Sequence, residues 1–270
     1  LQTFLPKSIK HELIRQTIKI PTVLPESLVI KVAETKSELE QAYRILHDSY
    51  VEMGYAKPQE CGMRITKYFA LPTTTTFVAL WDGQVVGTMS LIRQSTMGLP
   101  LEKEFDLSQL RQGGAMIAEV SSLAIHRDFR HQRGSIFLPL CKYFHDYARL
   151  YMKVDAAVIA VNPSWVDFYE GYLLFEKLQA KTVSNYDFAN GAPAVGLVLD
   201  FRTFNLRYDE VYGQRESESN LRDFFLLTKF ANLWFPKHIS TKQVMTPVMT
   251  PVMLRYFFFE TVNIWEQLSE

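Results

Sequence analysis

The sequence contains little cysteine, and its cysteines predict neither a disulfide nor a metal site. Cys61 and Cys141 are the only two among 270 residues, and they lie far apart in the chain. The six histidines are scattered without partners at ligand spacing, so no metal site is predicted. A chain with so few thiols and no cysteine framework is typical of a reducing compartment, and we expect a cytoplasmic protein.

The sequence also lacks an excess of charge and any long apolar run. Lys+Arg and Asp+Glu number 29 each, which gives no reason to expect nucleic acid as a partner. The longest apolar runs, such as AAVIAV (156–161), are too short to span a membrane, and charged residues interrupt the N-terminal apolar positions of a possible signal peptide. Aromatic residues are abundant instead, at 13%, which suits a large apolar cavity, a partner surface or simply a well-filled core.

The order of predicted elements indicates a mixed sheet with helices on its faces. A capping box, Thr35 with Glu38, predicts that a helix starts after the first strand, and Asp82-Gly83 predicts a tight hairpin. Strands are predicted at 28–34, 76–81, 84–92, 115–125, 155–161, 178–186 and 194–201, and further helices at 106–112, 135–152 and 164–175. Antiparallel pairs that alternate with helical crossovers predict an α/β or α+β fold.

The ends of the chain differ from this core. Residues 1–27 are interpreted as an N-terminal arm, 28–201 as the core domain, and 202–270 as a C-terminal helical extension packed on the core. Helices are predicted at 225–235 and 251–268, on either side of the repeat VMTPVMTPVM (244–253). Thr250 and Pro251 suit the cap and the first position of the last helix.

A basic turn, HRDFRHQRGS (126–135), joins a core strand to the helix at 135–152. A glycine-containing turn before a helix can bind an anion, because the first N–H groups of the helix are free. The residues alone fit a solvated charged loop equally well. The candidate anion-binding residues are Arg127, Arg130, Arg133, Gly134 and Ser135.

This strand, turn and helix resemble the central motif of the GNAT acyltransferase superfamily, in which the turn holds the pyrophosphate of acyl-CoA. One strand later, Asn162, Tyr169-Glu170 and Phe175 look like the second GNAT signature. The chain departs from the family at Ile136, where a second glycine is usual, and at Pro139 in the first helical turns. We therefore expect the turn to dock an acidic acyl carrier protein, or its phosphopantetheine arm, rather than CoA.

Several longer segments are similar to bacterial long-chain N-acyl amino acid synthases, of the N-acyltyrosine synthase type found in environmental bacterial DNA. These segments are 70–92, 98–100, 118–125, 160–170 and 191–201. The resemblance implies a GNAT-like core and transfer of a fatty acyl group from a carrier-protein thioester to the α-amine of an amino acid, with tyrosine as the implied acceptor. It implies no bound cofactor.

Two residues are the candidate catalytic groups. Glu119 shares a strand face with Ile117, Ser121 and Leu123, where a carboxylate is costly unless a cleft opens beside it, so we expect it to take the proton of the attacking amine. The alternative is an acid on an outward or edge face. Tyr169 lies where many GNAT enzymes hold the tyrosine that protonates the departing thiolate, and the alternative is a core tyrosine.

Other residues are predicted to bind the substrates. In GNAT folds a backbone N–H near the end of this strand stabilises the oxyanion, which here corresponds to Leu123, Ala124 and Ile125. Arg93, or alternatively Arg64, is the expected clamp for the acceptor carboxylate, although either could be a solvated surface arginine. The remaining candidates for substrate contact are Thr74, Thr75, Thr76, Asn162 and Trp165.

Three other functions remain open from the sequence. AEVSSLA (118–124) also resembles the E-x-S-R motif of acyl-homoserine lactone synthases, but Ser122 replaces its arginine. A CoA-dependent acetyltransferase is disfavoured by Ile136 and Pro139. A non-catalytic module that binds an acyl carrier protein is disfavoured by the presence of both Glu119 and Tyr169.

Overall fold

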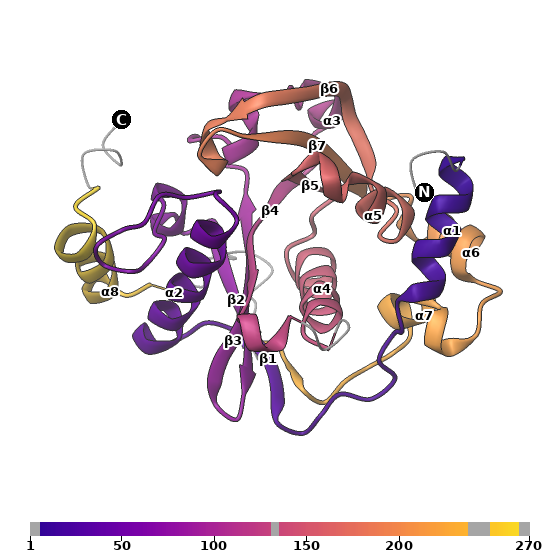
Figure 1. Ribbon diagram of the computed structural model, residues 1–270, viewed down its shortest axis with the longest axis horizontal. Coiled ribbons are helices and arrows are strands. Elements are labelled where there is room, and N and C mark those ends of the chain that lie inside the picture. The colour runs from indigo at the N-terminus through magenta and orange to yellow at the C-terminus, as the bar shows by residue number, and fades with distance from the viewer. Residues whose placement is uncertain (1–5, 131–134, 237–248, 265–270) are drawn as a thin grey trace.

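A mixed eight-stranded sheet forms the centre of the molecule, with helices on both faces (Figure 1). The computed structural model describes residues 6–130, 135–236 and 249–264. The strand order is β6-β7-β5-β4-β3-β2-β1-β8, antiparallel except for the pairs β4–β5 and β1–β8. The strands are β1 (Leu28–Val32), β2 (Thr74–Trp81), β3 (Gln84–Arg93), β4 (Ile117–Ile125), β5 (Ala156–Val161), β6 (Glu176–Tyr186), β7 (Ala192–Asp200) and β8 (Leu233–Trp234).

Helices α2 and α8 lie on one face of the sheet, and α4, α6 and α7 lie on the other (Figure 1). α4 continues into a π-helical turn at Tyr147–Tyr151, and α8 into one at Tyr256–Thr261. No helix in the described parts of the chain is long and apolar enough to cross a membrane. The α-helices are α1 (Lys7–Thr17), α2 (Lys36–Glu52), α3 (Ser108–Arg111), α4 (Phe137–Asp146), α5 (Val166–Gly171), α6 (Phe204–Tyr212), α7 (Leu221–Leu226) and α8 (Pro251–Arg255).

The predicted α/β fold is confirmed, and so are several of its local signals. The hydroxyl of Thr35 accepts from the Glu38 N–H at 3.1 Å while the Glu38 carboxylate accepts from the Thr35 N–H, which is the predicted capping box. Asp82 and Gly83 both have positive φ, at 47° and 81°, as the hairpin turn between β2 and β3 requires. Thr250 accepts from the Met253 N–H at the start of α8.

The helix predicted over 225–235 is wrong beyond Leu226. The chain leaves α7 there and reaches the outer edge of β1, where Leu233 and Trp234 pair with it in parallel as β8. The side chain of Asn232 donates to the carbonyls of Pro25 and Leu28, which holds the segment at that edge. The hydrogen bonds gained by pairing with the open edge of β1 outweigh the helical preference of this segment.

Residues of the predicted N-terminal arm form α1, which packs on α5. Arg15 Nε donates to the carbonyl of Gly171 at 2.8 Å, and Lys7 pairs with Glu170 at 2.9 Å. His11 lies between them, and it places a ring nitrogen 3.7 Å from Asp167. The arm thus contributes to the position of α5.

The sheet opens between β4 and β5. These two strands pair only over Ile117–Glu119, whereas β5 stays paired with β7 as far as Val161. β4 stays with β3 instead, so the second half of β4 and the second half of β5 diverge. Two strands of one sheet that separate in this way leave backbone and side chains of both facing a common space.

Candidate active site

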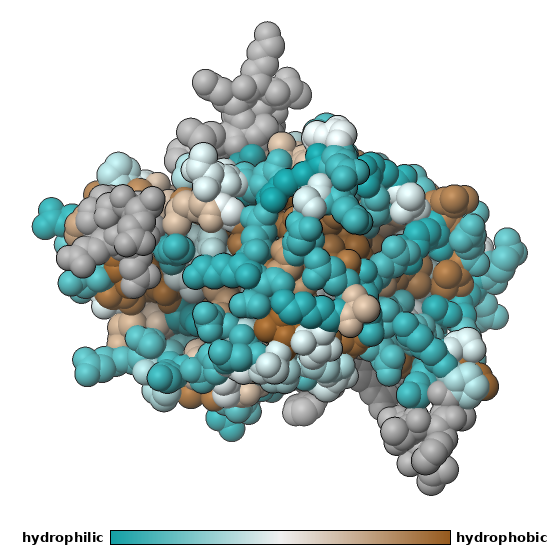
Figure 2. Space-filling model, turned by 90° about the horizontal axis from the view of Figure 1, so that it is seen from above, coloured by the Kyte–Doolittle hydropathy of each residue, from teal (hydrophilic) through white to brown (hydrophobic). Residues whose placement is uncertain are grey.

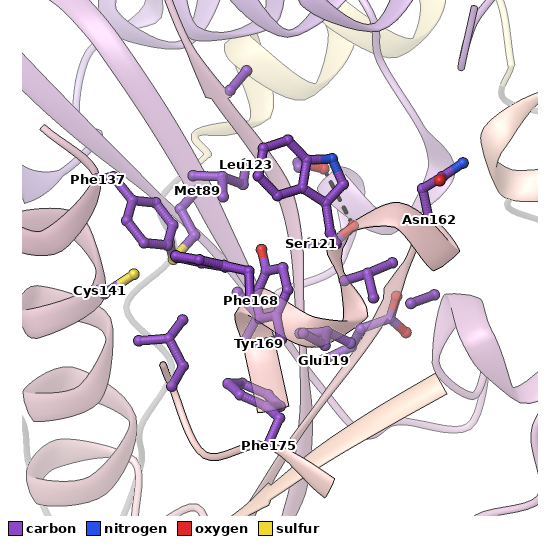
Figure 3. A pocket seen from close by; sticks show the side chains of 18 of the residues that line it. Met89, Glu119, Ser121, Leu123, Phe137, Cys141, Asn162, Phe168, Tyr169 and Phe175 are labelled. Carbon is purple, nitrogen blue, oxygen red and sulfur yellow. Dashed lines mark hydrogen bonds between the residues drawn. The ribbon is translucent and has the colours of Figure 1, made fainter. Parts of the chain in front are cut away.

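A cavity of about 740 Å³ occupies the space where β4 and β5 diverge. Seen from the top of Figure 1, apolar surface is visible between hydrophilic side chains (Figure 2). The cavity is bordered by the second half of β4, the end of β5, helix α5 and one side of α4 (Figure 3). The predicted site residues that line it are Glu119, Leu123, Ala124, Ile125, Arg130, Asn162, Trp165 and Tyr169.

Glu119 lies on β4 at the last position where that strand pairs with β5. Its side chain is 2% exposed, and Oε2 accepts a hydrogen bond from the Leu101 N–H at 2.9 Å. Burial raises the pKa of Glu119 to about 8; the charge of Glu102 adds to this rise and the Leu101 hydrogen bond opposes it. No cation of the described residues pairs with the carboxylate. Glu119 therefore sits in mid-sheet rather than at an edge, and its proton affinity suits exchange with an amine.

β4 carries a bulge between Ser121 and Ala124, shortly after Glu119. Ser90 of β3 lies opposite Ser121 and Thr88 lies opposite Ala124, so β4 has one residue more than β3 over this interval. Ser122 has a positive φ of 57°, which is rare for serine. The bulge turns the backbone of Leu123–Ile125 along the cavity wall, where the predicted oxyanion donor would have to lie.

Tyr169 lies on α5 and lines the cavity opposite β4. Its ring makes edge contacts with Phe168 and Phe175, at centroid distances of 5.5 and 5.6 Å. Its hydroxyl has no hydrogen-bond partner in the described residues and points toward Leu123 (Figure 3). Burial raises the pKa of Tyr169, so the hydroxyl stays protonated and remains a donor.

The deep part of the cavity is an aromatic tunnel between α4 and the C-terminal helices. The side chains that form it are Phe144, Phe201, Phe204, Tyr208 and Phe225. Only an apolar chain can fill such a space without leaving polar groups unpaired. The aromatic residues Phe257 and Phe258 do not line the cavity and pack on α2 instead.

One polar side chain, His145, lies among these aromatic residues, and a polar network lies behind it. His145 lines the tunnel and hydrogen-bonds through Nδ1 to Asp146 at 2.9 Å. Burial lowers the pKa of His145, which keeps its ring neutral near pH 7. Lys142 donates to Asp146 at 2.7 Å and to the carbonyl of Phe225 at 2.8 Å, so it ties α4 to α7 behind the tunnel.

The basic turn is only partly described, because Arg133 and Gly134 lie outside the described residues. Arg130 connects the end of β4 to α2 beside the cavity. Its Nε donates to the carbonyl of Ile125 at 2.9 Å, and its guanidinium pairs with Glu52 at 2.7 Å. Arg127 is exposed and forms no ion pair with the described residues. Ser135 directly precedes the first turn of α4. Of the two described arginines, Arg127 is the one available to a partner.

Several predicted substrate contacts lie outside the cavity. Thr74, Thr75 and Thr76 are buried in β2, where the Thr74 hydroxyl donates to the carbonyl of Tyr68 at 2.6 Å. Arg93, at the end of β3, is not among the residues that line the cavity. Asn162 does line the rim, but its side chain accepts from Ser164, so it caps the next turn.

The structure also adds residues that the sequence did not indicate. Tyr50 of α2 and Tyr186 of β6 also line the cavity. Burial raises the pKa of both hydroxyls, and the charge of Glu119 raises it further. His145 and Phe204 define the deep end. Their elements are far apart in sequence, and no spacing rule brings them together.

Comparisons with known proteins agree with this geometry. The family model for N-acyl amino acid synthase FeeM matches residues 41–200. The structure of FeeM, an N-acyl amino acid synthase from uncultured soil microbes, is 26% identical with a TM-score of 0.58, over 66% of this chain and 93% of that one. No curated protein sequence matches significantly.

Two acyl-homoserine lactone synthases are among the other similar structures. LasI is 17% identical with a TM-score of 0.47, over 64% of this chain and 89% of LasI. The CoA-dependent synthase BjaI, solved with SAM and isopentyl-CoA, is 16% identical with a TM-score of 0.48, over 79% of this chain and 95% of BjaI.

Proposed function

Because the chain belongs to the N-acyl amino acid synthase FeeM family and is therefore an acyltransferase, we propose that it transfers a long-chain fatty acyl group from an acyl carrier protein to the α-amine of an amino acid. Tyrosine is the proposed acceptor. One observation carries the proposal: a single cavity of about 740 Å³ is lined by both a buried carboxylate and a cluster of aromatic side chains. The carboxylate suits an amine, and the tunnel suits an acyl chain.

The proposed chemistry assigns a role to each group at the opening of the sheet. The neutral amine attacks the thioester carbonyl carbon, a C–N bond forms, and the C–S bond breaks. The proton lost by the amine passes to Glu119, directly or through water, and Tyr169 donates a proton or a hydrogen bond to the departing thiolate. A backbone N–H at Leu123–Ile125 stabilises the oxyanion. The products are an N-acyl amino acid and the free thiol of phosphopantetheine.

A carrier protein is the proposed donor because the start of α4 is poorly suited to a pyrophosphate. Ile136, Leu138 and Pro139 of its first turn are buried. Pro139 also has no N–H to offer a phosphate oxygen. Arg127, exposed at the nearby turn, suits the acidic surface of a carrier protein. No bound cofactor is proposed; the acyl-phosphopantetheine thioester is a substrate.

Product analysis tests the proposal. The enzyme is incubated with long-chain acyl carrier protein, a mixture of amino acids and S-adenosylmethionine, and products are identified by mass spectrometry. We expect an N-acyl amino acid, with N-acyltyrosine dominant, and much slower turnover when acyl-CoA replaces the carrier protein. A lactone, or carrier-protein binding without turnover, would refute the proposed reaction. Equal turnover with acyl-CoA would refute only the proposed donor.

A further inference from the structure

A second cavity, of about 520 Å³, lies behind the aromatic wall of the first. The two cavities share three lining residues, Tyr55, Tyr186 and Phe188. The first cavity holds Glu119, and the second holds Arg64. The shared wall is therefore the place where a small molecule could contact both a proton acceptor and a fixed positive charge.

Arg64 is a charge without a counter-ion. Its guanidinium lies against the rings of Tyr50 and Phe188, at 4.9 and 5.1 Å from their centroids, and Nη2 donates to the carbonyl of Phe188 at 2.7 Å. Its Nε is buried and has no hydrogen-bond partner, and no carboxylate of the described residues pairs with the side chain. Burying a guanidinium with an unsatisfied N–H destabilises the folded protein unless an anion accepts that hydrogen bond and balances the charge.

Tyr186 adds a second unused donor at the same place. The side chain is 4% exposed, and its hydroxyl is buried without a hydrogen-bond partner. Burial raises the pKa of this hydroxyl most, the charge of Glu119 raises it further, and the charge of Arg64 lowers it. Tyr186 thus feels both charges and lines both cavities, and its buried O–H is unpartnered in the described residues.

We propose that Arg64 and Tyr186 bind the α-carboxylate of the acceptor at the shared wall, so that the enzyme selects free amino acids over amines that lack a carboxylate. An Arg Nε–H and a Tyr O–H can each donate to a carboxylate oxygen. The amine and the carboxylate of an α-amino acid are attached to the same carbon. A carboxylate bound here therefore keeps the amine on the Glu119 side of the wall. This inference rests on the proposed acyl transfer and names its acceptor class.

The test compares amino acids with their decarboxylated amines: L-tyrosine with tyramine, and L-leucine with isoamylamine. Binding of each to the full-length protein is measured by calorimetry without an acyl donor, and kcat/KM is measured with acyl carrier protein. We expect each amino acid to be preferred over its amine by roughly 10- to 150-fold, the value of a hydrogen bond to a charged group. Tyr186→Phe and Arg64→Leu should both reduce this preference, mainly through KM of the amino acid, and should affect the amines less than the amino acids.

Tyr186→Phe is the decisive variant because it removes a hydroxyl that bonds to nothing in the described protein, so it should fold normally. Tyr43→Phe, which removes another buried hydroxyl outside both cavities, is the control. Equal use of amino acids and amines, or an unchanged preference in Tyr186→Phe, would overturn the inference. Loss of the preference in Arg93→Leu instead of Arg64→Leu would place the clamp at the end of β3. Acylation of neither amino acids nor amines would refute the proposed function itself.

Discussion

Replacing Glu119 with glutamine should make the protein more stable at alkaline pH while it abolishes most of the activity. Glutamine has nearly the same size, and its side-chain oxygen can still accept from the Leu101 N–H. It cannot ionise, however. The variant therefore isolates the consequence of burying a carboxyl group at the point where β4 leaves β5.

The expected stability change follows from the two pKa values. In the unfolded chain the group titrates near its ordinary value of 4.5, and in the folded protein its pKa is about 8. Below pH 4.5 both states are protonated and the group has no effect. Between these values the unfolded state loses a proton that the folded state keeps, so stability falls as pH rises, by about 1.4 kcal/mol per pH unit. Above pH 8 the wild type has lost at most roughly 4–5 kcal/mol that Glu119→Gln retains.

Urea unfolding of both proteins from pH 4.5 to 9 measures this difference. The unfolding free energies should be similar at pH 4.5 and separate steadily up to about pH 8. Glu176→Gln is the control, because Glu176 is exposed on β6 and pairs only with Arg207 among the described residues. A constant difference across the pH range would refute the conclusion that burial perturbs Glu119.

The activity of the same variant tests the role of Glu119 as a base. Single-turnover acyl transfer should fall roughly 100- to 10,000-fold, the usual contribution of general base catalysis. The wild-type rate should rise with pH until the carboxylate and the amine are both deprotonated, and this rise should flatten in Glu119→Gln. Wild-type turnover in the variant would remove Glu119 from the mechanism.

Three further predictions concern the rest of the site. Tyr169→Phe should slow single-turnover transfer roughly 10- to 100-fold with unchanged substrate binding, since its hydroxyl bonds to no described residue in the resting protein; an unchanged rate would make it a core tyrosine. Phe204→Leu, which shortens a ring at the deep end, should shift the products toward longer acyl chains by mass spectrometry, and an unchanged distribution would place the end of the tunnel elsewhere. Arg127→Glu should raise KM for acyl carrier protein and weaken its salt dependence, whereas the same change at the distant Lys177 should not.

Much of the sheet could be predicted because its signals are local. The capping box at Thr35 and the turn at Asp82-Gly83 depend on neighbouring residues, and the structure has both. The segment around Leu233 could not be predicted in the same way. Its strand exists because β1 offers a free edge, and that edge is more than two hundred residues away in sequence.

The candidate site likewise contains some residues that local sequence signals indicate and others that depend on the packing of distant segments. Glu119 could be singled out as a candidate because a carboxylate on a core strand is costly unless a cleft opens beside it. The bulge at Ser122 could not be predicted, because serine rarely adopts a positive φ and nothing in the sequence indicates that it does so here. Arg64 is one of the two arginines that the sequence offers as a carboxylate clamp. Tyr186 has no such signal, because its significance comes only from lining both cavities.

The way the aromatic tunnel ends has a consequence for what the enzyme can release. Lys142 fastens α4 to the Phe225 carbonyl of α7, and Asp146 holds both Lys142 and His145. A wall made only of apolar side chains could yield to a longer guest by repacking, but this one would have to break buried ionic hydrogen bonds. Under the proposed function this rigid wall sets the maximum length of the acyl chain. Product chain lengths should then end abruptly at an upper limit instead of tailing off.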